Sequence, residues 1–280
     1  MTMNIGASIP AAKQLVAAVE NAGGTVPAAL TNALDGLDLL NAHAAPSDPA
    51  LSILSAAVDG TLDAERLDQL CADAARDEAI NTYRQQLRGR AEGLFLDRFH
   101  RTLCGGAADE ILDSLRDQFT SAANTLAEAT ALVDMTVDPR QLADHGSPEE
   151  LAAYRSVRPA VAKLDEISSI AALFGPRSIS WAVLDLPQGV DDRGLVDEAV
   201  CCCTDGDLVQ AGAVFRARTS AVPWLRITPH LNSIAEAKER LRLWAEKAFD
   251  ATVSNQGRGR FEDGKFVPMP VANPYAASAT

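Results

Sequence analysis

The side chains with the clearest potential for chemistry are three consecutive cysteines, Cys201 to Cys203. A zinc site needs four converging ligands, usually a Cys-x-x-Cys pair with a second pair of Cys or His. No such spacing surrounds these residues, and free cysteine is among the most buried residue types. His100 and Cys104, four residues apart, would supply only half of a metal site. The sequence therefore predicts small buried side chains at the cysteine run and no metal centre.

The patterns of the common enzyme classes are also missing. The chain contains no Gly-x-Ser-x-Gly, Ser-x-x-Lys or His-Glu-x-x-His and no phosphate-binding loop. Asp191 and Asp192 are neighbours in a predicted loop, where adjacent side chains point apart and do not converge as a catalytic pair must. The sequence Gly257-Arg258-Gly259-Arg260 occurs once and is interpreted as a linker. We therefore expect no enzyme activity and no cofactor.

The amino-acid composition disfavours some classes of binding partner. The 280 residues include 25 Lys and Arg against 38 Asp and Glu, a formal net charge of −13. This excess of acidic residues disfavours nucleic-acid binding, which depends on cations that neutralise phosphates. No stretch approaches the roughly 18 apolar residues of a membrane helix, and the first residues lack the pattern of a secretory signal. We expect a cytoplasmic protein with reduced thiols and neither a membrane nor a nucleic-acid partner.

Charge divides the chain at Gly175-Pro176, a pair that can end a helix. Residues 1–174 hold 13 basic and 25 acidic residues, and residues 175–280 hold 12 and 13. We predict an acidic helical domain over 1–174, a small α+β domain over 175–267 and an extended tail over 268–280.

Two long helices dominate the first part. One is expected from Asp63 to Leu103, interrupted by no proline. The second carries apolar residues spaced alternately three and four apart, a coiled-coil seam: Leu112, Leu115, Phe119, Ala122, Leu126, Ala129 and Val133. The short connection at Gly105-Gly106 predicts that the two helices fold back as an antiparallel hairpin over 63–134. Its seam would be the core of a helical bundle or that of a free-standing arm.

Shorter helices complete this part. They are expected from Ser8 to Gly23, from Pro27 to Asn41 and from Asp48 to Gly60. Ser147 to Glu150 forms a capping-box pattern, which predicts a helix that Pro159 interrupts and a further helix over 160–174.

Charged faces of the two long helices are candidate interaction sites. Asp109, Asp113 and Asp117 lie off the apolar stripe of the second helix, where they are solvated or face a basic partner. Arg84 and Arg88 belong to an arginine cluster on the first helix. Pairing with acidic residues three or four positions away explains the cluster, and a stripe that faces an acidic partner is the alternative.

After residue 175 the apolar period changes from 3.6 to 2, the period of a strand. Strands are expected over 179–183, 199–203, 208–209, 213–219 and 224–228, with a hairpin turn at Asp205-Gly206. A capping box at Ser233 to Glu236 opens one helix, and Phe261 to Phe266 forms a further small hairpin. The tail, with Pro274 and Tyr275 as candidate contact residues, would order only on another surface. The predicted fold class is α+β, with a mainly helical first part and a small antiparallel-sheet module.

The Ala-rich, Lys-poor chain also resembles the proteins encoded near capsid genes in actinobacterial phages and prophages. The resemblance is carried by Gly105 to Asp109, Phe174 to Arg177, Cys203 to Gly206, Pro223-Trp224 and Ala272 to Tyr275. It implies a virion-assembly or head-associated protein and transfers no functional residues.

These observations favour a non-enzymatic structural or assembly protein that acts through protein–protein contacts. Self-association through the helical part, and contacts with coat or other virion proteins, are the expected interactions. Two alternatives are kept: a small-molecule enzyme or binder with a pocket between the two domains, and a regulatory module that binds a basic protein.

Overall fold

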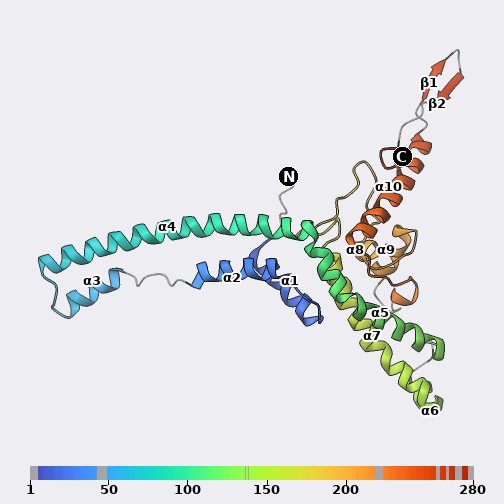
Figure 1. Cartoon of the computed structure of the whole chain (residues 1–280), viewed down its shortest axis with the longest axis horizontal. Coiled ribbons are helices and arrows are strands. Elements are labelled where there is room, and N and C mark those ends of the chain that lie inside the picture. Colours follow the sequence, from blue (N-terminus) through green and yellow to red (C-terminus); the bar gives the residue numbers. More distant parts are fainter. Residues whose placement is uncertain are drawn as a thin grey trace. The chain divides into compact units, whose positions relative to one another are not determined.

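The computed structural model describes residues 6–42, 49–135, 137, 139–217, 223–256, 259–262, 265–268 and 273–276. The chain forms two compact units (Figure 1). We call Met1–Pro27 together with Leu103–Thr280 the large unit, and Ala28–Thr102 the small unit. Within the described ranges, no helix is both long enough and apolar enough to cross a membrane.

The large unit is built almost entirely from helices. In chain order its elements are α1 (Ile9–Asn21), the π-helical turn η1 (Leu103–Ala107), α5 (Ala108–Leu132), α6 (Pro139–His145), α7 (Pro148–Ala172), α8 (Asp197–Cys201), α9 (Leu208–Arg216), the 3-10 turn η2 (Pro223–Leu225), α10 (Ile234–Gln256), β1 (Gly259–Glu262) and β2 (Lys265–Pro268).

The core of this unit lies between α5 and α7, which run antiparallel and pack along their lengths (Figure 1). The predicted seam of α5 is buried from Leu112 to Val133, and α7 contributes Leu164 and Ile167, both fully buried. Trp224 packs against both of these helices. Its ring lies edge-on to Phe119 of α5 at 5.7 Å, and its Nε1 donates to Asp165 of α7 at 2.8 Å. The seam is therefore the core of a bundle.

The partner of that seam differs from the prediction. We expected α5 to fold back on the long helix that precedes it, whereas the helix that covers the seam is α7. The glycine connection forms a π-helical turn in which Gly106 has a φ of 122°, a backbone conformation that glycine adopts readily. The predicted hairpin over 63–134 is therefore wrong in its pairing, although both of its helices are present.

The first helix of the large unit follows its sequence signals. The Ser8 hydroxyl accepts a hydrogen bond from the Ala11 N–H and caps α1. Gly23 ends the helix with a φ of 79°, and the N–H of Gly24 donates back to the Val19 carbonyl at 2.9 Å. Both ends of α1 were predicted from these residue types.

The predicted sheet module is wrong. Residues 179–181 form a turn and 182–183 belong to no helix or strand. Residues 199–201 lie in α8, 208–216 form α9, and 223–225 form a 3-10 turn. Within the described ranges, the only sheet is the two-stranded β1–β2 hairpin, and one isolated bridge joins Cys203 to Pro229. The fold is mainly α-helical rather than α+β.

Two physical features explain this error. A short continuous apolar run such as Ala199 to Cys203 has no period that separates a buried strand from a buried helix. Asp207, interpreted as part of a hairpin turn, instead caps α9 by accepting hydrogen bonds from the N–H groups of Val209 and Gln210, each at 3.0 Å. An aspartate before an apolar segment favours an N-cap as well as a turn.

Other local predictions for the large unit are confirmed. Both capping boxes form, at Ser147 with Glu150 and at Ser233 with Glu236. The small hairpin also forms, with Phe261 opposite Phe266; its turn lies outside the described residues. Pro159, by contrast, does not interrupt its helix, because α7 continues through it to Ala172.

The small unit consists of α2 (Ala28–Ala42), α3 (Pro49–Val58) and α4 (Ala64–Thr102). The predicted long helix is confirmed as α4, whose 39 residues span about 58 Å at 1.5 Å per residue. Both α2 and α3 pack on α4. The buried apolar side chains described in this unit are few: Leu30, Leu34, Leu37, Phe95 and Phe99.

Candidate interaction surface

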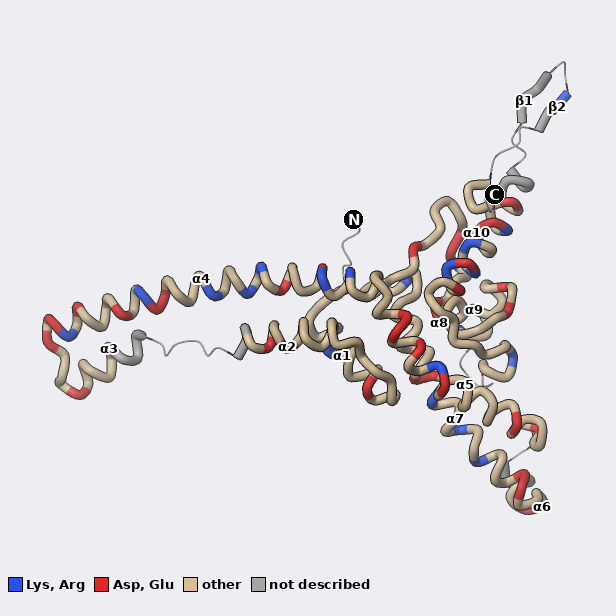
Figure 2. The backbone as a smooth tube through the Cα atoms, in the orientation of Figure 1, with Lys and Arg blue, Asp and Glu red and all other residues tan. Residues whose placement is uncertain are grey.

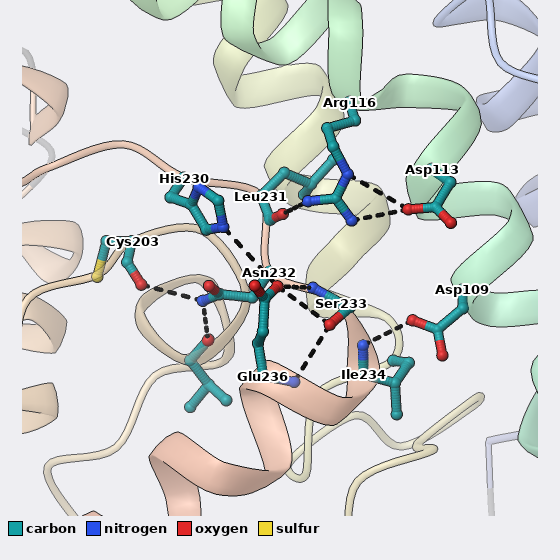
Figure 3. Close-up of polar contacts among 11 residues, drawn as sticks. Asp109, Asp113, Arg116, Cys203, His230, Leu231, Asn232, Ser233, Ile234 and Glu236 are labelled. Carbon is teal, nitrogen blue, oxygen red and sulfur yellow. Dashed lines mark hydrogen bonds and ion pairs between the residues drawn. The ribbon is translucent and has the colours of Figure 1, made fainter.

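The densest polar cluster of the large unit surrounds the start of α10 (Figure 3). Asn232 is 2% exposed, and its side-chain amide donates to the carbonyls of Val200 at 2.9 Å and Cys203 at 3.0 Å. Its backbone N–H donates to the Cys201 carbonyl at 2.8 Å. One buried asparagine thus satisfies three carbonyls at the end of α8, which would otherwise lose their hydrogen bonds with water.

Two of the predicted contact residues on α5 belong to this cluster. The Asp109 carboxylate accepts from the Ile234 N–H at 2.7 Å and supports the positive end of α10. Asp113 pairs with Arg116 at 2.8 Å, and Arg116 also donates to the Leu231 carbonyl. Asp109 and Asp113 therefore hold α10 on α5, whereas Asp117 is exposed on the same helix.

The cluster also holds a serine, a glutamate and a histidine, the residue types of a hydrolase triad. In such a triad the histidine lies beside the serine oxygen and takes its proton. Here Glu236 lies between the other two, accepting from the Ser233 hydroxyl at 3.0 Å and lying 3.7 Å from His230. Hydrogen bonds from Ser233, the backbone N–H first, lower the pKa of Glu236. This is the geometry of a helix cap, in which the serine hydroxyl meets the glutamate and not the histidine.

The three consecutive cysteines are buried, as predicted. Burial raises the pKa of Cys203 to about 11, against the opposing effect of Arg240, and raises the pKa of Cys201 and Cys202 further. A thiol with a raised pKa is a poor nucleophile at neutral pH. Within the described ranges, no group of three or more His, Cys, Asp or Glu is placed to hold a metal ion.

A groove of about 520 Å³ runs beside α1 and α7 in the large unit, with Trp181 at one end. Its charged and hydroxyl groups are engaged within the chain. Glu166 pairs with Lys163 at 2.6 Å, and the Ser180 hydroxyl donates to the Gly6 carbonyl at 3.2 Å. The groove is therefore open and largely apolar, with these polar groups turned to structural contacts.

The predicted contact residues of the tail lie against α10. The Tyr275 carbonyl accepts from Arg242 at 2.6 Å, its ring meets Phe249 edge-on at 6.3 Å, and its hydroxyl donates to the Gln188 carbonyl. Pro274 is exposed between these contacts. Tyr275 thus orders on a surface of its own chain; residues 277–280 lie outside the described part.

The small unit carries the exposed apolar surface. Of the 14 large hydrophobic side chains that are exposed among the described residues, eight lie between residues 28 and 102. On α4, Ile80 is 40% exposed, Tyr83 61%, Leu87 44% and Leu94 69%. These four residues fall on one face of the helix.

Extending that face in both directions gives positions spaced alternately three and four apart, the spacing of a coiled-coil seam. We define the α4 seam as Asp73, Arg76, Ile80, Tyr83, Leu87, Arg90, Leu94 and Asp97. Three of these positions form ion pairs along α4: Asp73 with Arg76 at 3.5 Å, and Asp97 with Arg101. The apolar centre of the seam is bare within the described small unit.

The arginines on α4 lie beside this seam. Of the cluster identified in the sequence, Arg101 makes the intrahelical pair that was expected. Arg84, Arg88 and Arg90 are exposed and take part in none of the ion pairs among the described residues. Pairing along the helix therefore does not account for Arg84 and Arg88.

Sequence reasoning identified the seam that is buried and missed the one that is exposed. The seam positions of α5 are all apolar, whereas those of α4 include Asp73, Arg76, Arg90 and Asp97. Counting every position at the 3-4 spacing, charged ones included, would have found the α4 seam. No protein-family model matches this chain, and neither a curated protein nor a solved structure matches it. The function must be argued from these residues themselves.

Proposed function

We propose that this chain is a non-enzymatic assembly protein that acts through protein–protein contacts made by the α4 seam. The observation that carries the proposal is the row Ile80, Tyr83, Leu87 and Leu94, four large side chains exposed on one face of a 39-residue helix. Burying one such side chain is worth roughly 1.5–3 kcal/mol, and exposed apolar rows of this kind mark interaction sites.

The organisation of the small unit supports this proposal. Both α2 and α3 pack on α4, yet they leave the seam uncovered. A groove of about 720 Å³ between α2 and α4, lined by Ala33, Gly36 and Leu94 among others, adjoins the seam. The small unit therefore offers a partner helix both an apolar row and a shallow depression beside it.

The proposal is tested by substituting the centre of the seam. Leu87→Arg places a guanidinium in the apolar contact and should abolish association, as read from the molar mass by light scattering after size exclusion. Leu243→Arg is the matched control, because Leu243 is the same residue type, 42% exposed on α10. The control should keep the molar mass of the unmodified chain. A monomeric unmodified chain at every concentration, or equal effects of the two variants, would refute the proposal.

The biological setting of this assembly is proposed on the resemblance to proteins encoded near phage and prophage capsid genes. In that setting the α4 seam would act during head assembly, with further contacts to coat or other virion proteins. The test is co-expression with the coat protein of the same phage or prophage. Particles should carry the unmodified chain and exclude the Leu87→Arg variant, and absence of both from particles would remove the virion setting.

A further inference from the structure

The α4 seam has a charge pattern as well as an apolar one. Residues 64–78 of α4 include five acidic and two basic residues, whereas residues 79–91 include three arginines and no acidic residue. Figure 2 shows this division along the helix. Two copies of α4 that lie side by side in opposite directions would place the acidic part of each beside the basic part of the other.

We propose that two copies of this chain pair through α4 in antiparallel orientation, with Ile80 of one copy opposite the partner's Tyr83. The inference rests on the proposed function and adds to it the partner, the direction and the register. A two-fold axis between the helices makes every contact occur twice.

This register matches charges within the seam. Asp73 faces the partner's Arg90, and Arg66, one heptad before the seam, faces the partner's Asp97. Leu87 lies opposite the partner's Arg76, whose aliphatic stem can cover it while the charged end reaches water. The centre is thus apolar, and its ends are opposite charges.

The edges of the seam agree with the same register. Asp77 and Arg84 occupy equivalent positions one heptad apart along one edge, so Asp77 lies beside the partner's Arg84. On the other edge Ala72, Ala79 and Gly93 are small, and Gln86 between them is uncharged. A Cβ added at Gly93 would meet no atom within 4 Å, which leaves room for a neighbouring helix to approach.

Other arrangements place like charges together. A shift of one heptad brings Asp73 against the partner's Asp97, or Arg66 against the partner's Arg90. A parallel pair brings Arg76 against the partner's Arg76 and Arg90 against the partner's Arg90. Like charges in facing positions are destabilising, so the charge pattern favours one antiparallel register.

Charge reversal tests the pairing. Asp77→Arg and Arg84→Asp should each weaken the dimer about tenfold, because each creates two repulsive contacts in place of two ion pairs. The double variant Asp77→Arg with Arg84→Asp should restore the affinity of the unmodified chain. Residues 77 and 84 are about 10 Å apart along one helix, so restoration requires two chains. Dissociation constants come from sedimentation equilibrium on the full chain.

A second double variant is the matched control. Arg66→Asp with Asp73→Arg has the same seven-residue spacing and no change in net charge, yet this register predicts that both positions become mismatched. It should weaken the dimer at least tenfold, since four ion pairs are lost. Equal behaviour of the two double variants would overturn the register.

Disulfide formation tests the direction. The exposed Cys71 and Cys104 are first replaced by serine. Chains with Ile80→Cys and chains with Tyr83→Cys are then mixed and oxidised, and mixed disulfide dimers should predominate. Dominance of disulfides between two Ile80→Cys chains would indicate a parallel pair and overturn this inference. If Leu87→Arg still dissociated the complex, the proposed function would survive, whereas a monomeric unmodified chain would remove both.

Discussion

The seams of α5 and α4 have the same alternating spacing of three and four residues, but the α5 seam is buried and the apolar residues of the α4 seam are exposed. On α5 every seam position is apolar, and the row is buried against α7. On α4 charged seam positions flank Ile80, Tyr83 and Leu87 on both sides, and these three side chains are exposed. Apolar content determines whether a seam must be covered within its own chain, because each exposed apolar side chain raises the free energy of the folded state. The charged positions lower the apolar content of the α4 seam and so lower the free-energy cost of its exposure.

The largest expected effect comes from placing a carboxylate in each seam. Leu115→Asp should lower the free energy of unfolding by at least about 4 kcal/mol, because it combines a lost core side chain with an unpaired buried charge. Leu87→Asp should change the unfolding free energy of the monomer by less than about 0.5 kcal/mol, as expected of an exposed site. Urea denaturation followed by circular dichroism measures both. A comparable loss in the two variants would mean that the α4 seam is covered within the chain.

The next effect compares two asparagines. Asn232→Ala removes the donor that satisfies the Val200 and Cys203 carbonyls and should cost about 2–3 kcal/mol, the penalty of leaving buried polar groups unpaired. Asn81 is half-buried on α4. Asn81→Ala should instead stabilise its helix by about 0.5 kcal/mol, because alanine has the higher helix propensity. Thermal unfolding compares the two, and a small loss for Asn232→Ala would show that those carbonyls find other donors.

Much of this contrast could be predicted from the sequence, and part of it could not. The bounds of α1 and α4 and the start of α10 followed from cap residues and apolar periods, which are local signals. The partner of α5 is a long-range choice between two amphipathic helices, and the spacing of Leu112 to Val133 does not encode it. The segment after Gly175 was misassigned because Asp207 and the cysteine run are each compatible with two local structures. Packing of α8 against α7, α9 and α10 favours the helical one.

An effect of intermediate size on the unfolding free energy is expected from the ionisation of Asp197 in the large unit. Burial raises the pKa of Asp197 to about 6, with a contribution from the Glu198 charge, while the Arg177 N–H opposes the shift. The folded-state pKa therefore exceeds the unfolded value, so stability rises as pH falls from about 7 through 6 towards 4. Asparagine carries no ionisable group. Asp197→Asn should therefore abolish this pH dependence and stabilise the folded chain by about 1–2 kcal/mol at pH 7.5.

The measurement is the unfolding free energy of Asp197→Asn minus that of the unmodified chain at several pH values. This difference should shrink between pH 7 and pH 4, because the unmodified aspartate becomes protonated in the folded state. The backbone N–H of Arg177 donates a hydrogen bond to Oδ1 of Asp197 at 3.1 Å. The side-chain oxygen of asparagine can accept the same hydrogen bond. A difference independent of pH would mean that Asp197 titrates normally.

The smallest expected effect comes from replacing one glycine by alanine in each of the two units. Gly89 lies within α4, where a Cβ would meet nothing within 4 Å, whereas a Cβ at Gly24 of the large unit would lie 2.7 Å from Leu115. Gly89→Ala should therefore stabilise α4 by up to about 1 kcal/mol through helix propensity, and Gly24→Ala should destabilise the large unit through overpacking. Because position 89 points away from the seam, Gly89→Ala should also leave association unchanged. Loss of association in Gly89→Ala, measured by sedimentation, would show that the partner contacts a second face of α4.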